Sequence, residues 1–202
     1  MNNSQDQNVV FVRHGETEWS KSGKHTSITD VPLTDEGRRM SSLVGRALAG
    51  RHFTKVLSSP LSRALETCSI AGYGAQAEIR DDLLEMNYGI YEGLTTAEIR
   101  TSRPDWSVWT GPTPNGETPE QVGRRCDRVI AEVRSADGDV LIFAHGHNLR
   151  ILGARWVDLP ADGGRLLALA TASISTVGYE REQPVLSLWN SEAHLHGGPL
   201  PA

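Results

Sequence analysis

The sequence has only two cysteines, Cys68 and Cys126, which lie far apart and outside any Cys-x-x-Cys motif. A disulfide framework and a thiolate metal site both need more cysteines at closer spacing, so we expect neither, and we interpret both thiols as buried and inert. No apolar run approaches the roughly 20 residues of a membrane span, and the polar start MNNSQDQN has no targeting pattern. These absences predict a soluble, cytoplasmic protein that does not bind membranes.

Lysine and arginine are also too few to dominate the charge, because 20 of them stand against 25 Asp and Glu, for a net charge of -5. Such a chain has no global attraction to nucleic acid, so basic groups that matter must act locally. We see no linker and expect one domain over residues 1–202, with loose ends at 1–8 and about 191–202. His194 and His196 in the second of these ends are expected to be solvated.

Apolar runs and helix signals alternate along the chain. Buried strands are expected at Val9–Arg13 and Val140–Ala144, and shorter or weaker ones at 55–57, 77–81, 172–179 and 184–189. Helices are expected after the N-cap Thr34, from Pro60, over 95–103, after the capping box at 118–121 and from about Asn148, with loops at 20–33 and 101–117. This alternation predicts an α/β fold with a mostly parallel sheet.

The two most apolar strands end in the same way, in VVFVRHG and in VLIFAHG. Because ligands of open α/β sheets bind outside the carboxyl ends of the strands, parallel pairing would bring His14 and His145 to one point. Gly15 and Gly146 would let the backbone turn sharply and approach a ligand closely.

An arginine joins these histidines from the stretch SSPLSRALETC. Ser59 is a plausible cap and Pro60 suits the first helical position, which puts Arg63 in the first turn, close to the end of the preceding strand. With Arg13, this gives two guanidiniums and two imidazoles in one pocket of an acidic protein. Arginine suits bidentate contact with phosphate, so the pattern points to a phosphoryl group and argues against a bound metal ion.

Four motifs resemble those of the histidine phosphatase superfamily, the phosphoglycerate mutase-like group: RHGETEW at 13–19, SSPLSRALET at 58–67, LEMNYGIYEG at 84–93 and FAHGH at 143–147. They occur in the order and spacing of that family and cover most of the chain. The resemblance implies a three-layer α/β/α sandwich around a mostly parallel central sheet, with no metal or organic cofactor.

The resemblance also implies residue roles. His14 matches the nucleophile that becomes phosphohistidine, and Glu85 matches the general acid. Arg13, Arg63 and His145 match the remaining catalytic positions of the phosphate pocket. The positions that match substrate contacts are Arg13, Ser20, Thr26, Arg63, Tyr88, His145 and Gly146.

The chemistry requires such a set. A neutral imidazole can attack phosphorus in line and divide one hard displacement into two easier ones. Charge on the equatorial oxygens needs fixed positive partners, which Arg13, Arg63 and a protonated His145 could supply. Glu85 would protonate the leaving alcohol and later take a proton from water, and such help is worth about 10²–10⁴-fold.

Several features depart from the mutases of this family. Mutases usually carry Asn at Ser20, an Arg-Phe pair at Lys24-His25, Gly at Ser27 and Arg at Met86. Fewer basic contacts on the substrate side favour a phosphatase of the small acid and sugar-phosphate branch, acting on a small phosphorylated metabolite such as a sugar phosphate or bisphosphate. The alternatives are a phosphoglycerate mutase or related phosphotransferase, and a non-catalytic phosphate-binding interaction module.

Other polar residues receive lesser roles. Lys24, Arg100 and Arg103 are the cations that could meet a second phosphate. Glu16 and Glu92 are interpreted as supporting carboxylates, and His25 and His52 as surface residues. His147 and Asn148 either edge the pocket or cap the following helix. Trp106 and Trp109 are expected to pack their loop onto the body, and the alternative is that they bind substrate. The tryptophans and the closing strands could also serve a contact between two copies of the chain.

Overall fold

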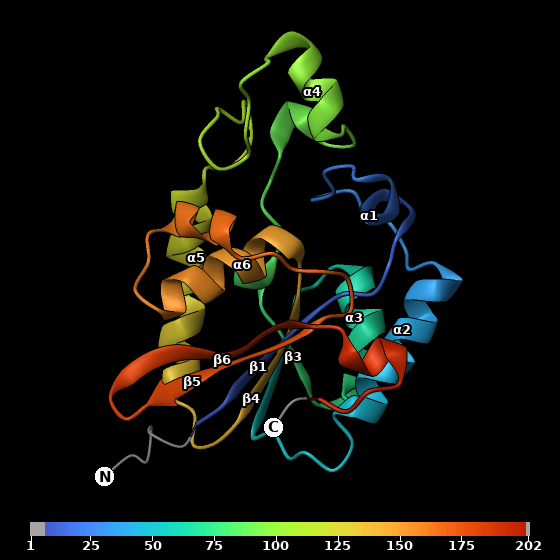
Figure 1. Ribbon diagram of the computed structural model, residues 1–202, viewed down its shortest axis with the longest axis vertical. Coiled ribbons are helices and arrows are strands. Elements are labelled where there is room, and N and C mark those ends of the chain that lie inside the picture. The colour runs from blue at the N-terminus through green and yellow to red at the C-terminus, as the bar shows by residue number, and fades with distance from the viewer. Residues whose placement is uncertain (1–6, 201–202) are drawn as a thin grey trace.

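A computed structural model describes residues 7–200. A six-stranded sheet in the order β3-β2-β4-β1-β5-β6 lies between two layers of helices (Figure 1). The strands are β1 (Val9–Arg13), β2 (Lys55–Ser58), β3 (Ala77–Ile79), β4 (Val140–Ala144), β5 (Ile174–Glu180) and β6 (Gln183–Ser191). The pairings β3–β2, β2–β4 and β4–β1 are parallel, whereas β1–β5 and β5–β6 are antiparallel. The predicted three-layer sandwich is therefore confirmed.

The helices lie on both faces of the sheet and beyond its carboxyl edge (Figure 1). They are α1 (Glu18–Ser22), α2 (Asp35–Ala47), α3 (Ser62–Ile70), α4 (Thr96–Ser102), α5 (Pro119–Arg134) and α6 (Gly146–Trp156), and short 3₁₀ turns join some of the elements. In residues 7–200 no helix is both long and apolar enough to cross a membrane.

The sheet has a separate apolar core on each face. Val9 and Phe11 of β1 pack with α5 and α6, whereas Val10 and Val12 pack with α2 and α3. Because both faces are covered, the central strands are continuous apolar runs rather than alternating ones. The two strands identified as most buried in the sequence are therefore neighbours at the centre of the sheet.

The parallel register of β1 and β4 sets the position of the site. Arg13 pairs with Ala144, and the backbone N–H of His14 donates to the carbonyl of Ala144 over 3.0 Å. Each strand is followed at once by its histidine, so His14 and His145 leave the sheet side by side. This placement confirms the convergence expected from the two His-Gly junctions.

Gly15 and Gly146 have different reasons to be glycine. A Cβ on Gly15 would overlap with the carbonyl oxygen of Gly37, so this glycine permits close packing of the β1 turn against α2. A Cβ on Gly146 would lie 3.4 Å from Arg13 Cζ and 3.6 Å from Glu85 Oε2, an ordinary contact distance. Glycine at 146 therefore keeps the space between a guanidinium and a carboxylate open.

Residues 18–29 and 89–116 form a cap beyond the carboxyl edge of the sheet (Figure 1). Lys24 and Thr95 form a backbone bridge that ties the two cap segments together. We expected a loop over residues 20–33, but its first residues belong to the short helix α1, which ends at Ser22. A capping box of Thr17 and Ser20 starts this helix. The cap is the outer wall of the space above His14.

Two further expectations need correction. The helix α3 begins at Ser62 with Leu61 as N-cap, so Pro60 precedes it, although Arg63 does lie in its first turn. The end at 191–200 is not loose, because His194 is 5 % exposed and its Nε2 lies 3.1 Å from the carbonyl oxygen of Ala172. Gln7 is also buried, while residues 1–6 and 201–202 lie outside the described chain.

An ion-pair network across β2, β3 and α5 gives a test of acid stability. Hydrogen bonds from Arg80, and then from Lys55, lower the pKa of Glu132 to about 2. A lowered carboxylate pKa adds stability that is complete above the unfolded value near 4.5 and is lost as pH falls towards 2. We expect Glu132→Gln to lower the free energy of unfolding by about 1–2 kcal/mol at pH 7, a figure reduced for solvent screening, and by much less at pH 3.

Urea unfolding at the two pH values measures this difference. Glu36→Gln removes an exposed pair with Arg39 on α2 and should have little effect. An equal loss at both pH values for Glu132→Gln would show that its contribution is not ionic.

Candidate active site

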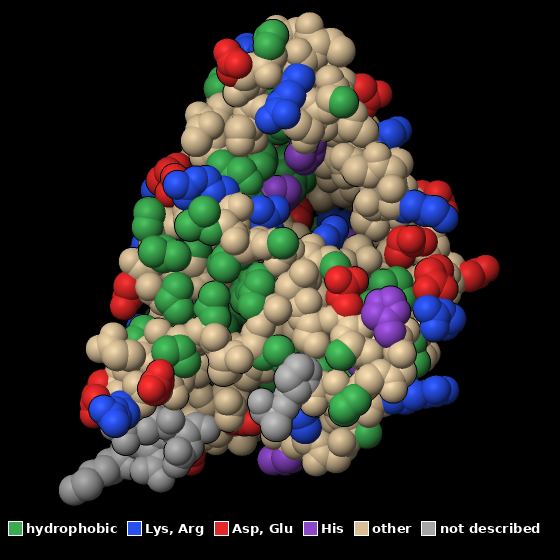
Figure 2. Space-filling model, viewed as in Figure 1, with side chains coloured by type: hydrophobic (Ala, Val, Ile, Leu, Met, Phe, Trp, Pro, Cys, Tyr) green, Lys and Arg blue, Asp and Glu red, His purple; other side chains and the backbone are tan. Residues whose placement is uncertain are grey.

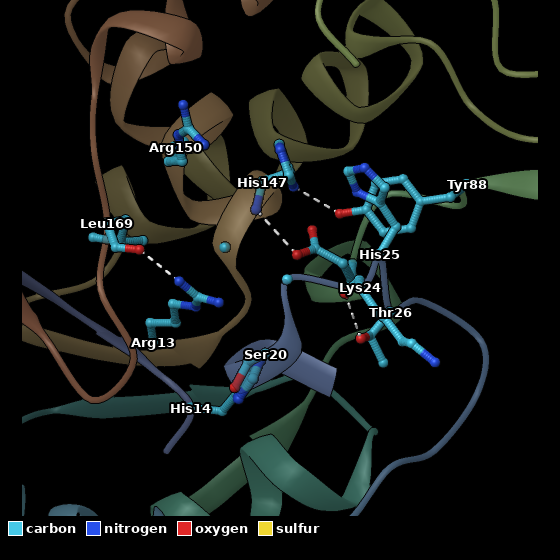
Figure 3. A pocket seen from close by; sticks show the side chains of 13 residues that line it. Arg13, His14, Ser20, Lys24, His25, Thr26, Tyr88, His147, Arg150 and Leu169 are labelled. Atoms are coloured by element: carbon cyan, nitrogen blue, oxygen red, sulfur yellow. Dashed lines mark hydrogen bonds between the residues drawn. The ribbon is translucent and has the colours of Figure 1, made fainter. Parts of the chain in front are cut away.

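A cavity of about 170 Å³ lies between the cap and the carboxyl edge of the sheet. Figure 2 shows this hollow, with histidine and basic side chains at its mouth, and Figure 3 shows its walls. It is lined by Arg13, His14, Ser20, Gly23, Lys24, His25, Thr26, Glu85, Tyr88, Gly146, His147, Arg150 and Leu169. One carboxylate thus faces several nitrogen-bearing side chains, which is an arrangement for binding an anion.

His14 is held ready as a nucleophile. Its Nδ1 lies 2.8 Å from the carbonyl oxygen of Gly15, which can only accept, so Nδ1 carries the proton and Nε2 keeps its lone pair. Burial lowers the pKa of His14 well below its ordinary value, and Arg13 and Arg63 lower it further. The imidazole is therefore neutral near pH 7, as in-line attack on phosphorus requires.

Arg13 provides a fixed cation beside His14. Its Nη1 donates to the carbonyl of Leu169 over 2.6 Å, which fixes the guanidinium from one side. Its buried Nε has no hydrogen-bond partner among residues 7–200. Burial lowers the pKa of Arg13, with Glu85 opposing this change, and a guanidinium still carries its charge near neutral pH. A bound anion would satisfy this unpaired donor.

Arg63 and His145 lie beside His14 but do not line the cavity. The ring centroids of His14 and His145 are 5.2 Å apart, and His145 and Arg63 are both fully buried. Arg63 Nε donates to His145 Nδ1 over 3.2 Å, which leaves the proton of His145 on Nε2, 2.7 Å from Ser59 Oγ. The other Arg63 nitrogens donate to carbonyls of residues 26–29, so this arginine also fastens the cap.

The protonated His145 that we expected is therefore not the form that its surroundings favour. Burial lowers the pKa of His145 well below its ordinary value, and Arg63 and then His14 add to this. His145 is a neutral N–H donor there, and positive charge comes from Arg13 and Arg63.

Glu85 is held at the amino end of α6. Its Oε1 accepts from the backbone N–H groups of Met86 and Asn148, each over 2.9 Å, and its Oε2 accepts from that of His147 over 3.0 Å. The N-cap residue His145 makes no side-chain capping bond, so Glu85 caps this helix instead. Oε2 accepts one N–H and retains a lone pair that can hold or take a proton at the cavity.

The expected substrate-side residues reach the cavity to different degrees. Ser20 and Thr26 line it, but their hydroxyls already donate to the carbonyls of Thr17 and Lys24. Tyr88 is 2 % exposed, and its hydroxyl lies 2.7 Å from His147 Nδ1. All three contribute to the wall of the cavity.

Two cavity residues, His25 and Arg150, were misjudged or missed from the sequence, whereas His147 does border the pocket, as one of its two expected roles had it. His25 is not on the surface, because its backbone pairs with Leu94 and Gly93 and its ring packs 4.7 Å from that of Tyr88. His147 and Arg150 also line the cavity. The spacing of three residues between His147 and Arg150 on α6 is the sequence signal that could have assigned both to the same helix face.

The supporting carboxylates behave as expected. Glu92 accepts the backbone N–H groups of Ser27 and Thr29, and thereby holds the cap segment that Arg63 contacts. Glu16 accepts from the Thr34 hydroxyl over 2.9 Å at the start of α2. Between residues 7 and 200, no group of three or more His, Cys, Asp or Glu side chains is arranged to hold a metal ion.

The lowered pKa of His14 predicts activity in acid. Because the nucleophile stays unprotonated below its ordinary value of 6.5, we expect kcat/KM to stay flat as pH falls through 6.5, after correction for the second ionisation of the substrate phosphate. Initial rates from pH 4 to 8 measure this, with circular dichroism at each pH as a control for folding. A fall centred at 6.5 or above would contradict the buried, neutral imidazole.

Known proteins resemble the chain over nearly its whole length. The acid phosphatase of Mycobacterium tuberculosis is 43 % identical over 187 residues, which cover 89 % of this chain and 92 % of that protein. The sedoheptulose 1,7-bisphosphatase of Saccharomyces cerevisiae is 37 % identical over 182 residues, covering 74 % and 67 % respectively. A solved structure of an open reading frame product of Mycobacterium tuberculosis superposes with a TM-score of 0.86 at 41 % identity, covering 92 % of this chain and 97 % of that one.

The sequence profile of one family accounts for both the motifs and the fold. It matches residues 9–192, which include both strand-end histidines, Arg63 and Glu85. The chain belongs to the histidine phosphatase superfamily, branch 1.

Proposed function

We propose that this protein is a metal-independent phosphatase that hydrolyses a small phosphorylated metabolite through a phosphohistidine on His14. The observation that carries the proposal is the neutral His14 imidazole, with its Nε2 lone pair free, in a cavity that it shares with Arg13 and Glu85. The two related phosphatases support the same reaction class.

In the first half of the reaction, His14 Nε2 attacks phosphorus in line and the bond to the leaving oxygen breaks. Arg13 stabilises the charge on the phosphoryl oxygens through its free N–H groups, and Arg63 adds positive charge from behind His14. Glu85 donates a proton from Oε2 to the leaving alcohol. The alcohol departs through the cavity towards the cap.

In the second half, a water molecule takes the place of the alcohol. Glu85, now ionised and held by three backbone N–H groups, accepts its proton as the oxygen attacks the phosphohistidine. The bond between phosphorus and His14 Nε2 breaks, and inorganic phosphate leaves. The imidazole returns to its neutral state with the proton still on Nδ1.

The mutase alternative is weaker on the substrate side. A mutase must retain a doubly phosphorylated intermediate, which needs several cations around the second acidic group. Met86, which occupies the position of a mutase arginine, is fully buried in the core. Arg100 donates its Nε to the carbonyl of Trp106 and so supports the cap rather than the cavity.

Two cations do line the cavity away from His14, and they favour a substrate with a second anionic group. Arg150 stacks over the ring of Trp109 at 4.5 Å and donates its Nε to the carbonyl of Gly164, which leaves its terminal nitrogens for a ligand. Lys24 lines the cavity from the cap. We therefore propose a sugar phosphate or bisphosphate as substrate, in line with the bisphosphatase among the relatives. We also propose a cytoplasmic location, which the two free, buried cysteines support.

Phosphate release in EDTA from sugar phosphates, bisphosphates, phosphoglycerates and an aryl phosphate tests the function. We expect release by the wild type and a loss of at least about 10³-fold in His14→Ala, since the nucleophile is removed. His52→Ala, at an exposed histidine, is the matched control. Interconversion of phosphoglycerates without release would favour the mutase, and binding without either reaction would favour the interaction module.

Removal of the Arg150 charge tests the substrate class. We expect Arg150→Gln to raise KM for sugar bisphosphates about 10–100-fold, because a charge-assisted contact is lost, and to change KM for the matching monophosphates less than about threefold. Steady-state kinetics on matched mono- and bisphosphates measures both values. Equal changes for the two substrates would place the second phosphate elsewhere.

A further inference from the structure

Glu85 lies on a segment that has little regular structure of its own. Residues 84–88 connect two short 3₁₀ turns, Asp81–Leu83 and Gly89–Tyr91, so no strand or helix fixes their backbone. Behind the segment is a second cavity of about 380 Å³, and Glu85 borders both this cavity and the active-site cavity. Met86 and Tyr88 are anchored in the core, but Leu84, Glu85 and Asn87 border this second cavity, so packing alone does not fix the backbone at Glu85.

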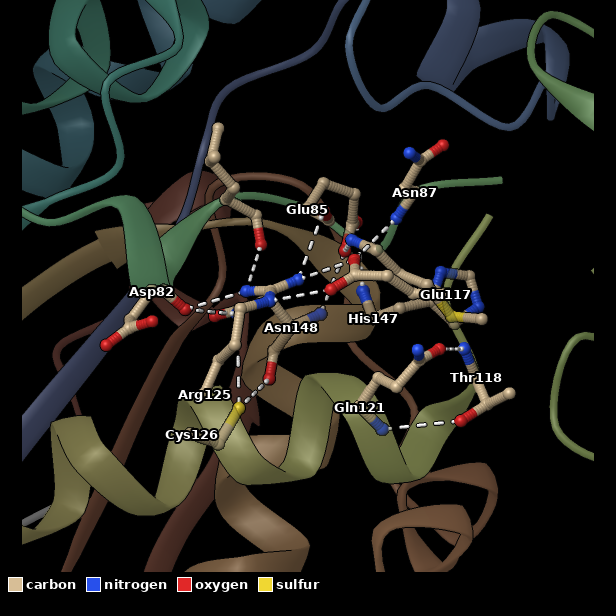
Figure 4. A network of polar contacts seen from close by, with 12 residues as sticks. Asp82, Glu85, Asn87, Glu117, Thr118, Gln121, Arg125, Cys126, His147 and Asn148 are labelled. Carbon is tan, nitrogen blue, oxygen red and sulfur yellow. Dashed lines mark hydrogen bonds and ion pairs between the residues drawn. The ribbon is translucent and has the colours of Figure 1, made fainter. Parts of the chain in front are cut away.

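Arg125 of α5 holds this backbone in place through hydrogen bonds (Figure 4). Its Nη1 donates to the carbonyls of Asp82 and Leu84 over 2.8 and 3.0 Å, and its Nη2 donates to that of Glu85 over 3.4 Å. Nε and Nη2 also donate to the carboxylate of Glu117 over 2.9 and 2.8 Å. All five N–H donors of this guanidinium are used, two of them on the Glu85 segment and one on Asp82 in the turn before it.

Glu117 completes the arrangement from the other side. Its Oε2 accepts the backbone N–H of Asn87 over 2.9 Å, two residues beyond Glu85. Glu117 itself precedes the capping box that starts α5, with Thr118 as N-cap and Pro119 in the first turn, so it is firmly placed. The Arg125–Glu117 pair therefore forms hydrogen bonds with the backbone on both sides of Glu85.

Charge and burial make this pair hard to replace. Only 14 % of the Arg125 side chain and 23 % of that of Glu117 are exposed. Burial lowers the pKa of Arg125, but the contact with Glu117 outweighs it and the net pKa is raised. Lysine at this position would keep the charge but could not reach the same five acceptors.

We propose that Arg125, paired with Glu117, is a positioning residue that fixes residues 82–87 and so aims the Glu85 carboxyl at the leaving oxygen. The inference rests on the proposed phosphatase function. A small displacement of a general acid can cost a large part of its effect. Loss of Arg125 should therefore matter most for substrates whose leaving group needs a proton.

The test compares kcat/KM for an alkyl phosphate, whose leaving alkoxide needs protonation, with that for 2,4-dinitrophenyl phosphate, whose leaving group does not. We expect Arg125→Lys to lower the first value about 30–100-fold and the second less than about threefold, because a displaced acid loses part of the roughly 10²–10⁴-fold that general acid catalysis supplies. Glu117→Gln should act in the same direction. Arg155→Lys is the matched control, since Arg155 forms a similar two-point pair with Asp127 away from the segment.

A double-mutant cycle separates positioning from a merely structural role. In a Glu85→Gln background, Arg125→Lys should lower kcat/KM for the alkyl phosphate less than about twofold, because the group that it positions is already gone. Thermal unfolding of each variant confirms that it is folded, and Glu117→Gln supplies the result if Arg125→Lys is not.

Two results would overturn the inference alone. Equal losses on both substrates would show a general structural effect, and an undiminished loss in the Glu85→Gln background would show that Arg125 acts through another group. Absence of phosphate release by the wild type, or no dependence on the leaving group in Glu85→Gln alone, would instead overturn the proposed function, and this inference with it.

Discussion

The parallel register between β1 and β4 is the constraint on which the site depends. It pairs Arg13 with Ala144 and releases the two following histidines at the same edge of the sheet. Both strands are buried on both faces, so a shift of register would disrupt two apolar cores as well as the site. The positions of His14 and His145 are thus fixed by the buried centre of the sheet.

Each later layer of the site is attached to this centre by polar contacts. Arg63 reaches from α3 to His145 and to the carbonyls of the cap, and Glu92 holds the same cap segment from the other side. Glu85 is held by the amino end of α6, which begins directly after His145. The junction between β4 and α6 therefore positions both groups: the end of β4 holds the backbone of His14, and the start of α6 holds the Glu85 carboxylate. The burial that keeps His14 neutral follows from the same packing.

Much of this could be predicted from the sequence, because the signals are local. Apolar runs identified β1 and β4, capping residues identified the starts of α2 and α5, and motif resemblance assigned His14, Glu85 and the arginines. The helix at 62–70 began later than Pro60 suggested, because Leu61 rather than Ser59 is its N-cap. The burial of His25 and of the 191–200 end depends on contacts between distant segments, such as Lys24 with Thr95 and His194 with Ala172, and no local pattern encodes those contacts.

The charge state of the site also could not be predicted from the sequence. A protonated His145 is reasonable for an exposed imidazole, but full burial beside Arg63 makes the neutral form the stable one. Likewise, the sequence predicts Arg63 as a phosphate contact, whereas in the structure this arginine fastens the cap and lies behind the cavity wall. Desolvation and shared hydrogen bonds, which need three-dimensional neighbours, decide both points.

The central claim is a double displacement through His14, and the stereochemical course at phosphorus tests it most directly. Hydrolysis of a substrate made chiral at phosphorus with oxygen isotopes and sulfur, followed by analysis of the released thiophosphate, gives the outcome. Two in-line steps predict net retention of configuration. Net inversion would mean that water attacks the substrate directly, and it would contradict the account of His14 as the nucleophile.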